Sequence, residues 1–494
     1  QLRGEDVAIS GDNVTNHGDI VAENSAAVAA EQGDITNTGS MVAGNVLNLQ
    51  SAQDIQNLGG ELVAKSLALD AGGNVEVATL ADAVGDPLNW MTRLTEQAQL
   101  RADNLSVTSG GNIRLQGAKV DAGLLTLVAD GDLSVKSVAV SQGSHMDQGD
   151  VKFTQSKVRQ LGSNLNSNLD MLLEAENDLS IMASNLNSEG DIKLKAQGDI
   201  TVGYALESDS LYSYRKDDGS FGSSKEQTIE AESQRVVGSN LAALGNLILN
   251  AESGGIALFA SSGHGEQGVE AVAGDGVRIE SAVNSEYRRT QVEEKNAARI
   301  KTRDTGSMTQ TLARAGLSSS ADISLDVKGN VVLAAAELEA TGDLRIGDAA
   351  LATDESGAMK LDENGNPIIE RGSIDNLYIG TVALENENWD IKTRSLRGPV
   401  KELAKASSVI MGAGGLYLPG LALGTKDMEI KLSESTESRV HERREVGSAL
   451  QAENIQLSAQ NDMTLTGSSL EADEESGKVV MLADNILLDT AATE

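Results

Sequence analysis

The chain has 494 residues, of which only 2% are aromatic and 4 are proline, whereas 51 are glycine. Its 74 acidic and 39 basic residues give a net charge of −35, which disfavours nucleic acid as a partner because polyanions would be repelled. The chain has no cysteine, which excludes disulfides and thiolate metal sites, and no apolar run long enough to suggest a transmembrane helix.

One phrase recurs along the whole sequence: Gly-Asp or Gly-Asn followed by alternating apolar and polar residues. Copies begin at Gly18, Gly33, Gly73, Gly111, Gly131, Gly190, Gly198, Gly329 and Gly342. Glycine adopts positive φ freely, and Asp or Asn tolerates the left-handed region, so each phrase predicts a turn. The alternation after it places Ile113 and Leu115 on one side of a strand and Arg114 on the other.

These repeats favour a solenoid. The apolar residues are mainly Val, Leu, Ile and Ala, which suit a narrow interior that is filled in the same way at every turn. Disorder is disfavoured because 40% of the residues are hydrophobic and regularly spaced. Hairpins in a β-sandwich are the alternative, although no Asn-Gly turn joins the repeats. We therefore predict an all-β protein, a parallel β-helix with about 20 residues per turn and roughly 16 turns.

In chain order, residues 1–79 are expected to form β-helix turns. Residues 80–103 form an insert in which Leu88, Met91, Leu94 and Ala98 would line one face of a short helix after Pro87. Residues 104–347 continue the β-helix, with polar excursions at about 141–161, 206–237 and 284–320. An irregular insert follows at 348–390, and 391–494 return to the β-helix, with an excursion at about 433–446.

The polar excursions alternate charged and β-branched residues, which predicts long β-arms that lie along the β-helix or project from it. Three of them return to the repeat on Gly-Ser-x-Leu, at Gly162, Gly238 and Gly447. Most aromatic residues fall within excursions, Trp90, Phe153, Tyr378 and Trp389 among them, whereas Tyr204, Phe259 and Tyr417 are expected in the repeat itself.

Basic charge is also displaced into the excursions, since residues 285–304 carry six basic residues against four acidic ones. Aromatic and arginine side chains are typical of partner-binding hot spots. The candidate contact residues are Tyr212, Tyr214, Phe221, Tyr287, Arg288, Arg289, Arg443 and Arg444. The alternative is that these rings only pin the arms to the β-helix.

No signature of catalysis is found. The four histidines, His17, His145, His264 and His441, are far apart and belong to no ligand pair. Nucleophile-elbow and phosphate-loop motifs are absent from the sequence, and no carboxylate pair stands out for glycan cleavage. Residues 362–367 are predicted to be a hairpin tip rather than a calcium loop, because position 373 is Ser and not the required Glu. We predict no catalytic, cofactor-binding or metal-binding residues.

Two of these patterns resemble a known family. The runs Ala71–Val77 and Gly238-Ser239-Asn240-Leu241 are similar to the repeats of filamentous haemagglutinin and of the contact-dependent growth inhibition exoproteins of two-partner secretion systems. Excursions closed by Gly-Ser-x-Leu resemble the second repeat type of that family. The resemblance covers nearly the whole chain, with 80–103 and 348–390 matching least.

The resemblance implies a right-handed β-helix and export through an outer-membrane partner transporter. It also implies a place at the bacterial cell surface, after the periplasm of the producing cell, and a role in delivering a toxin across the outer membrane of a neighbouring cell. An adhesin that binds a surface receptor and a passive spacer rod are the alternatives. The chain begins with Gln1 and no leader, as expected of an internal fragment.

Overall fold

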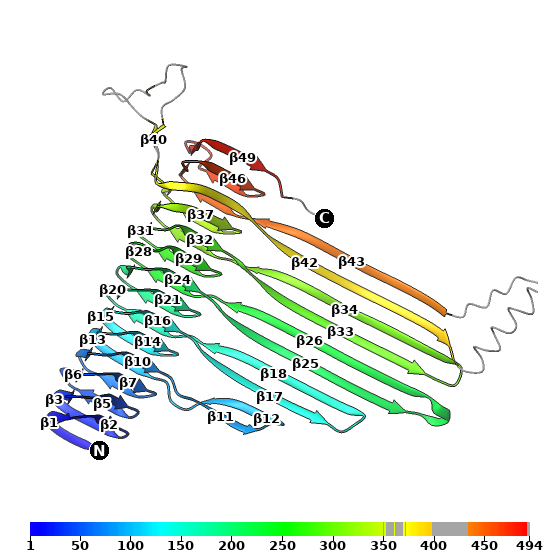
Figure 1. Ribbon diagram of the computed structural model, residues 1–494, viewed down its shortest axis with the longest axis horizontal. Coiled ribbons are helices and arrows are strands. Elements are labelled where there is room, and N and C mark those ends of the chain that lie inside the picture. Colours follow the sequence, from blue (N-terminus) through cyan, green and yellow to red (C-terminus); the bar gives the residue numbers. More distant parts are fainter. Residues whose placement is uncertain (349, 352–359, 361–368, 371, 398–432, 492–494) are drawn as a thin grey trace, which may run out of the picture.

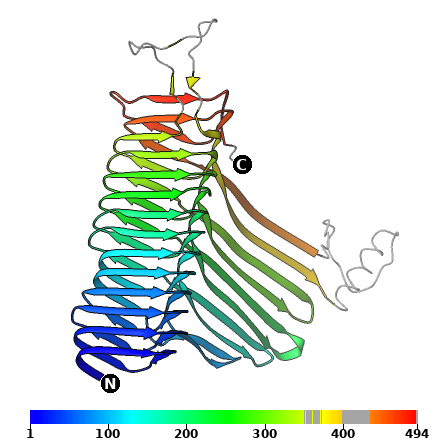
Figure 2. The ribbon, with the colours of Figure 1, turned by 60° about the vertical axis from the view of Figure 1, so that its left-hand side comes forward.

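The computed structural model describes residues 1–348, 350–351, 360, 369–370, 372–397 and 433–491. Figures 1 and 2 show a ladder of short strands that winds upward from the N-terminus, and a second sheet of long strands that projects from one side. The short strands pair in parallel and the long ones antiparallel. The prediction of a parallel β-helix with projecting arms is confirmed.

Each turn of the β-helix, here called a rung, contains three strands, and each strand pairs in parallel with its equivalent on the rungs above and below. The first strands are β1 (Leu2–Gly11), β3 (Asp19–Ala30), β5 (Ser40–Ala43), β8 (Glu61–Val63), β13 (Gln99–Ser109), β15 (Lys119–Ala129), β19 (Asn164–Ser167), β22 (Asn185–Ser188), β27 (Asn240–Ala243), β30 (Ser262–Gly265), β35 (Gly316–Ser319), β38 (Glu337–Ala340), β44 (Ala449–Ala452) and β47 (Ser469–Ala472).

The second and third strands follow the same order. Strands β1, β3, β13 and β15 continue into the second position, and the separate second strands are β6 (Val46–Ser51), β9 (Ser66–Ala71), β20 (Met171–Ala175), β23 (Ile192–Ala196), β28 (Asn246–Ala251), β31 (Gly268–Ala273), β36 (Ile323–Val327), β39 (Asp343–Ile346), β45 (Asn454–Ser458) and β48 (Val479–Leu482). The third strands are β2 (Val14–Asn16), β4 (Ile35–Asn37), β7 (Ile55–Leu58), β10 (Val75–Ala78), β14 (Ile113–Gln116), β16 (Leu133–Lys136), β21 (Leu179–Met182), β24 (Ile200–Gly203), β29 (Ile256–Phe259), β32 (Val277–Glu280), β37 (Gly329–Ala334), the start of β42 (Ile374–Leu396), β46 (Asp462–Thr466) and β49 (Asn485–Asp489).

The rungs stack fourteen high in the described residues, fewer than the sixteen predicted. One core column shows the register: Leu2, Ile20, Met41, Leu62, Leu100, Val120, Leu165, Leu186, Leu241, Gly263, Leu317, Leu338, Leu450 and Leu470. At ~4.8 Å per rung the stack is about 62 Å tall.

The interior of the β-helix is built from aliphatic side chains. Its cluster of buried residues contains Val, Ile, Leu, Ala and three methionines, and no aromatic ring among the described residues. Similar side chains recur at the same place on each rung, so every layer packs against a near copy of itself. This explains why the sequence has so few aromatic residues.

Six of the nine Gly-Asp and Gly-Asn phrases form the turn between second and third strands, whereas those at Gly190 and Gly342 lie between first and second strands and that at Gly18 precedes a first strand. Between second and third strands, the side-chain oxygen of one rung accepts a hydrogen bond from a backbone N–H of the next: Asp34 Oδ1 from Asp54 at 3.0 Å, and Asp54 Oδ1 from Asn74 at 2.7 Å. The series continues from Asn74 to Asn112 at 2.9 Å. Asp and Asn recur here because their short side chains reach the neighbouring rung.

The long strands form one antiparallel sheet, which we call the fin. Its strands, in spatial order, are β11 (Ala81–Asp86), β12 (Asn89–Leu94), β17 (Val138–Asp147), β18 (Val151–Leu161), β25 (Ala205–Asp218), β26 (Ser224–Val237), β33 (Ala282–Lys295), β34 (Arg299–Ala313), the outer part of β42 and β43 (Ser433–Gly447). A 3₁₀ turn at Ser220–Gly222 caps the β25–β26 hairpin. Two short strands, β40 (Ala350–Leu351) and β41 (Ile369–Glu370), pair separately.

Every arm leaves the β-helix at the same corner, between a third strand and the next first strand. Arms follow β10, β16, β24, β32 and β42, whereas β14, β21, β29, β37 and β46 turn directly through two residues. Arms therefore alternate with direct turns. A two-stranded hairpin is about as wide as two rungs, since both spacings are ~4.8 Å per strand, so successive hairpins meet edge to edge.

The predicted helix in residues 80–103 is wrong, because β11 and β12 form a hairpin there. The carboxylate of Asp86 accepts backbone N–H groups of Leu88 and Asn89, both at 2.8 Å, and closes the turn around Pro87. A helix here would have no apolar surface to pack against, since Leu88 is 53% exposed. Pairing of β12 with β17 satisfies the backbone hydrogen bonds instead.

The predicted irregular insert at 348–390 needs correction as well. Residues 374–380 are a rung strand, because β42 pairs with β37 and β46 and buries Ile374, Leu377 and Ile379. Tyr378 therefore lies on the β-helix and not in an excursion. Residues 381–395 pair with β43 and 396 with β34, so this stretch forms an arm, although 391–396 were expected in the β-helix. Residues 362–367 and Tyr417 lie outside the described residues.

The fin as candidate functional site

The corner where the arms leave explains the Gly-Ser-x-Leu motif. A Cβ atom on Gly238 would lie 1.9 Å from the carbonyl oxygen of Ala260 on the next rung, so only glycine fits. The Ser239 hydroxyl donates to Gly203 O at 2.7 Å and accepts the Ser184 N–H at 3.2 Å, inside the protein. Leu241 is fully buried. The motif marks the point where a chain rejoins the β-helix, and Gly162 and Gly447 make the same close approach.

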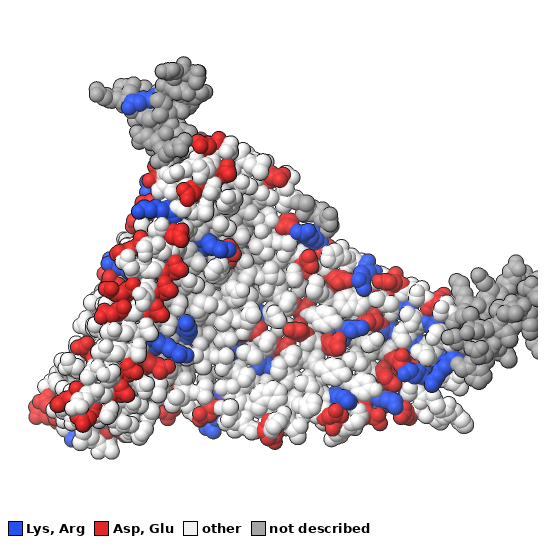
Figure 3. All heavy atoms as spheres, in the orientation of Figure 1, with Lys and Arg blue, Asp and Glu red and all other residues white. Residues whose placement is uncertain are grey.

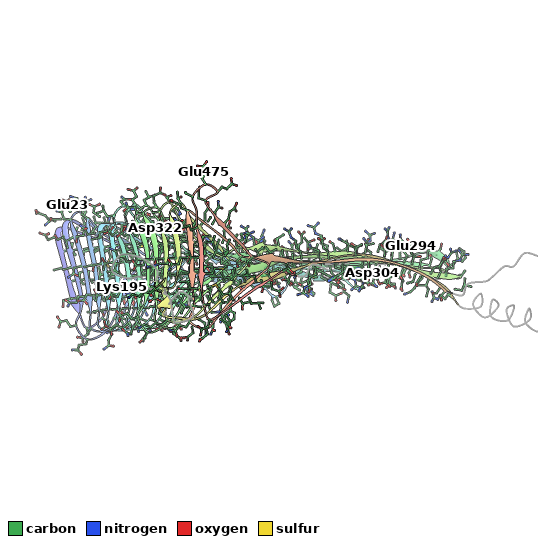
Figure 4. The ribbon with its side chains drawn as sticks, turned by 90° about the horizontal axis from the view of Figure 1, so that it is seen from above. Glu23, Lys195, Glu294, Asp304, Asp322 and Glu475 are labelled. Atoms are coloured by element: carbon green, nitrogen blue, oxygen red, sulfur yellow. The ribbon has the colours of Figure 1, made fainter. Side chains whose placement is uncertain are left out.

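The fin is a single layer, as Figure 4 shows when it is viewed along its edge. Side chains alternate between its two faces, and Glu294 and Asp304, labelled there, project from opposite ones. Most side chains of the long strands are exposed or half-exposed on both faces. Figure 3 shows acidic residues along the margin of the β-helix, whereas blue and red are interspersed over the fin.

One face of the fin carries all of its Tyr and Trp side chains, and we call it the aromatic face. The cross-strand register runs from Tyr212 through Glu230, Arg289 and Gly306 to Trp389. Tyr214 and Tyr287 lie two residues along from members of this row, and Trp90 lies in the next row on the same side, through Gly143, Ser156 and Ser210. We call the other face the basic face, after its cluster of Lys and Arg on β34 and β42.

Three strands are joined on the aromatic face by a group of polar and aromatic side chains. The guanidinium of Arg289 on β33 donates to both carboxylate oxygens of Asp304 on β34, to Oδ1 at 3.0 Å and to Oδ2 at 2.6 Å. Trp389 Nε1 on β42 donates to Asp304 Oδ1 at 3.1 Å. The Tyr287 and Trp389 ring centroids are 6.0 Å apart. Glu230 lies 3.6 Å from Arg289.

The electrostatics of this group follow from its hydrogen bonds. The Arg289 guanidinium holds the pKa of Asp304 below its usual range, against the partial burial that raises it, and the Trp389 hydrogen bond lowers it further. Asp304 reciprocally raises the pKa of Arg289. Both groups are therefore charged at neutral pH, and their contact stabilises the packing of β33, β34 and β42.

Both tryptophans cover a glycine on the adjacent strand. A Cβ atom on Gly143 would lie 2.1 Å from the Trp90 ring, and one on Gly306 would lie 2.1 Å from the Trp389 ring. Trp90 pairs directly with Gly143, and Trp389 with Gly306. An aromatic ring over a glycine shields backbone that has no side chain of its own and strengthens strand pairing. The rings thus pin arms to one another rather than to the β-helix.

The eight predicted contact residues do not form one surface. Tyr212, Tyr214, Tyr287, Arg289 and Arg443 project from the aromatic face, and Arg288 and Arg444 from the opposite one. Phe221 is 96% exposed at the tip of the β25–β26 hairpin. Trp389 and Asp304 were missed, because only the register of three strands from two adjacent arms brings them to Arg289.

Neither a metal site nor a membrane-spanning helix is found in the described part of the chain. It contains no group of three or more His, Asp or Glu side chains placed to hold a metal ion. No helix among the described residues is long and apolar enough to cross a membrane.

Comparison with known proteins gives four findings. The hemagglutinin repeat model matches residues 92–149 and 219–354, a narrower range than the resemblance seen in the sequence. A tRNA nuclease CdiA of Escherichia coli (strain STEC_O31) is 29% identical over 192 residues, 36% of this chain and 6% of that protein. A toxin CdiA of Escherichia coli is 29% identical over 150 residues, 28% of this chain and 5% of that protein. No solved structure matches.

Proposed function

Since the chain is a haemagglutinin-repeat region of the filamentous haemagglutinin and CdiA type, we propose that it is a non-catalytic segment of a large secreted exoprotein that takes part in toxin delivery into neighbouring bacteria. The step we assign to it is passage across the outer membrane of the target cell. Its partners are then an outer-membrane transporter of the producing cell and the surface of the target cell.

The fin is the observation that carries this proposal. A spacer rod needs only the β-helix, which is already closed by its own strand pairing and buried core. The arms add a broad, thin sheet with both faces open to water, held at a fixed angle by five returns at one corner. Such a sheet presents a large surface to a partner while adding little to the stability of the rod.

Charged residues on both faces define how the fin meets a membrane. Arg288 is 71% exposed on the basic face and Arg439 is 54% exposed on the aromatic face. Charged side chains are costly in the hydrocarbon layer, so the fin as folded acts at the membrane surface. The segment therefore docks the exoprotein on the target membrane and positions it there. The toxin itself crosses the membrane by a route that the fin helps to organise.

The aromatic face supports a second candidate, an adhesin. Tyr212, Tyr287 and Trp389 are partly exposed beside Arg289, and Tyr, Trp and Arg are the residues that dominate protein interfaces. On this view the face binds a receptor on a host or neighbouring cell.

The test is the intact exoprotein with this segment removed, with target-cell binding and toxin delivery scored separately. Binding retained with delivery lost supports the proposal. Loss of binding would favour the adhesin. If both survive, the segment is a spacer and the proposal is wrong. A matched control removes only residues 204–237, which excises one arm and leaves the rungs intact.

A further inference from the structure

Four basic side chains lie together on the basic face of the fin, near its outer end. In the register of β34 and β42, Lys301 is directly opposite Arg394, and Arg303 is directly opposite Lys392. Residues two apart on a strand share a face, so the four define one group, which we call the cation square. All four side chains are exposed.

The cation square is only partly neutralised by the carboxylates around it. Like charges directly opposite each other on a sheet destabilise it, and here two such pairs are adjacent. Asp390 contacts both Arg303, at 3.1 Å, and Lys392, at 2.9 Å. In the described part of the chain no carboxylate lies within 4.0 Å of the charged groups of Lys301 or Arg394. Glu294 is nevertheless directly opposite Lys301 on β33, and Glu434 is directly opposite Arg394 on β43. An anion at the square would relieve this repulsion.

The shape of the site fits an anion presented on a surface. A hollow of about 430 Å³ opens at the square, and its other lining residues include Val292 and Thr436 and the two carboxylates of Glu294 and Glu434, against four cations. The site is open and has an aliphatic side chain at its margin. Sites for single-stranded nucleic acid combine basic side chains with aromatic rings on which bases stack, and here the Tyr and Trp rings project from the opposite face.

The net charge of −35 opposes the approach of an anion to the chain as a whole, but it acts less strongly at the outer fin. Lys301 lies about 40 Å along β34 from Ala313, where the arm joins the β-helix, at ~3.4 Å per residue. The Debye length at physiological salt is about 8 Å, so the acidic β-helix is screened from the outer fin. Local charge therefore governs binding at the square.

We propose that the cation square binds the phosphate groups of lipid headgroups and lays the basic face of the fin on a phosphate-bearing membrane surface. Basic side chains with neighbouring aliphatic ones are the combination that binds anionic membrane surfaces. The choice of a lipid phosphate over a soluble one rests on the proposed function.

The test measures binding of the purified chain to phosphatidylcholine vesicles with and without phosphatidic acid. Lys301→Gln with Arg394→Gln is expected to weaken binding to the mixed vesicles roughly 30-fold. Because it removes a like-charge pair, this variant should unfold at the same or a higher temperature. Lys301→Arg with Arg394→Lys keeps the charges and should bind as the unmodified chain does.

The matched control is Lys152→Gln with Lys216→Gln, which changes the net charge equally on the aromatic face. It should retain binding to the mixed vesicles. Equal loss in this control, or unchanged binding by the Gln variant of the square, would overturn the inference. Binding of inorganic pyrophosphate or a polynucleotide without binding of vesicles would also overturn it. If the purified chain binds the mixed vesicles but the exoprotein without this segment still delivers its toxin, the proposed function is wrong and the inference about the cation square stands.

Discussion

At the scale of single residues, the positions that recur most often are those where one rung touches the next. Gly238 is glycine because the Ala260 carbonyl occupies the space of a side chain, and Ser239 is serine because its hydroxyl satisfies buried backbone groups. Where a third strand turns directly into the next first strand, the first residue of the two-residue corner has a positive φ, as Ala183, Ala260 and Ala335 do.

Removing the Ser239 hydroxyl should therefore be costly. Ser239→Ala leaves a buried backbone N–H, that of Ser184, without its partner, whereas the Gly203 carbonyl still accepts the Ala183 N–H and the Ser261 hydroxyl. Such groups cost about 1–3 kcal/mol when their partner is lost, so the free energy of unfolding should fall by about that amount. Urea denaturation measures it, with Ser233→Ala, on a half-exposed arm position, as the control. A loss no larger than that of the control would contradict this account.

At the scale of elements, arms are held to one another by contacts on the sheet faces. The Arg289–Asp304–Trp389 group joins three strands whose residues are up to 100 positions apart in the sequence. Trp389 over Gly306 adds a packing contact to the same join. Together they give the outer fin local interactions that the β-helix core does not supply.

The join should open in acid. The pKa of Asp304 is lowered in the folded chain, so its contribution is present above the unfolded pKa of about 3.9 and is lost as the pH falls through the folded value. The chain has two tryptophans, so Trp90→Phe makes Trp389 the sole reporter. Its emission should shift to the red on acidification below about pH 4. Asp304→Asn in the same background should abolish the pH-dependent step, and persistence of the step would assign it to another group.

At the scale of the whole molecule, a parallel solenoid and an antiparallel sheet share one repeat distance. Arms on alternate rungs place hairpins side by side without gaps, because two strands and two rungs have the same width. The β-helix thereby sets the register of the fin.

This relation predicts the effect of removing an arm. Excision of residues 204–237 joins Gly203 to Gly238-Ser239, a two-residue corner like Ala183-Ser184 on the rung below. The β-helix should keep its unfolding temperature within a few degrees, because its buried core is unchanged. The fin should separate into two sheets, since β18 would lose its partner β25 and β33 its partner β26. Limited proteolysis should then cleave the flanking arms faster, and unchanged protection would show that the arms fold independently.

The sequence by itself determined the β-helix, its repeat length and most of the arms, because turn residues and the alternation of apolar residues are local properties. The Gly-Asp turns and Gly-Ser returns could be identified one by one, as at Gly111 and Gly238. Where local signals conflicted the predictions were wrong: the helical spacing at Leu88 and Met91 belongs to a hairpin, and Tyr378 lies on a rung.

Only the tertiary structure decided that the arms join into a single fin with two different faces. Which side of a strand a residue occupies depends on register, and the register of β34 against β42 is set by rungs that are separated in sequence by whole arms. Trp389 could be recognised in the sequence as an aromatic residue of an excursion, but not as the partner of Asp304. The Lys301–Arg394 pair likewise exists only because two distant arms leave from the same corner on alternate rungs.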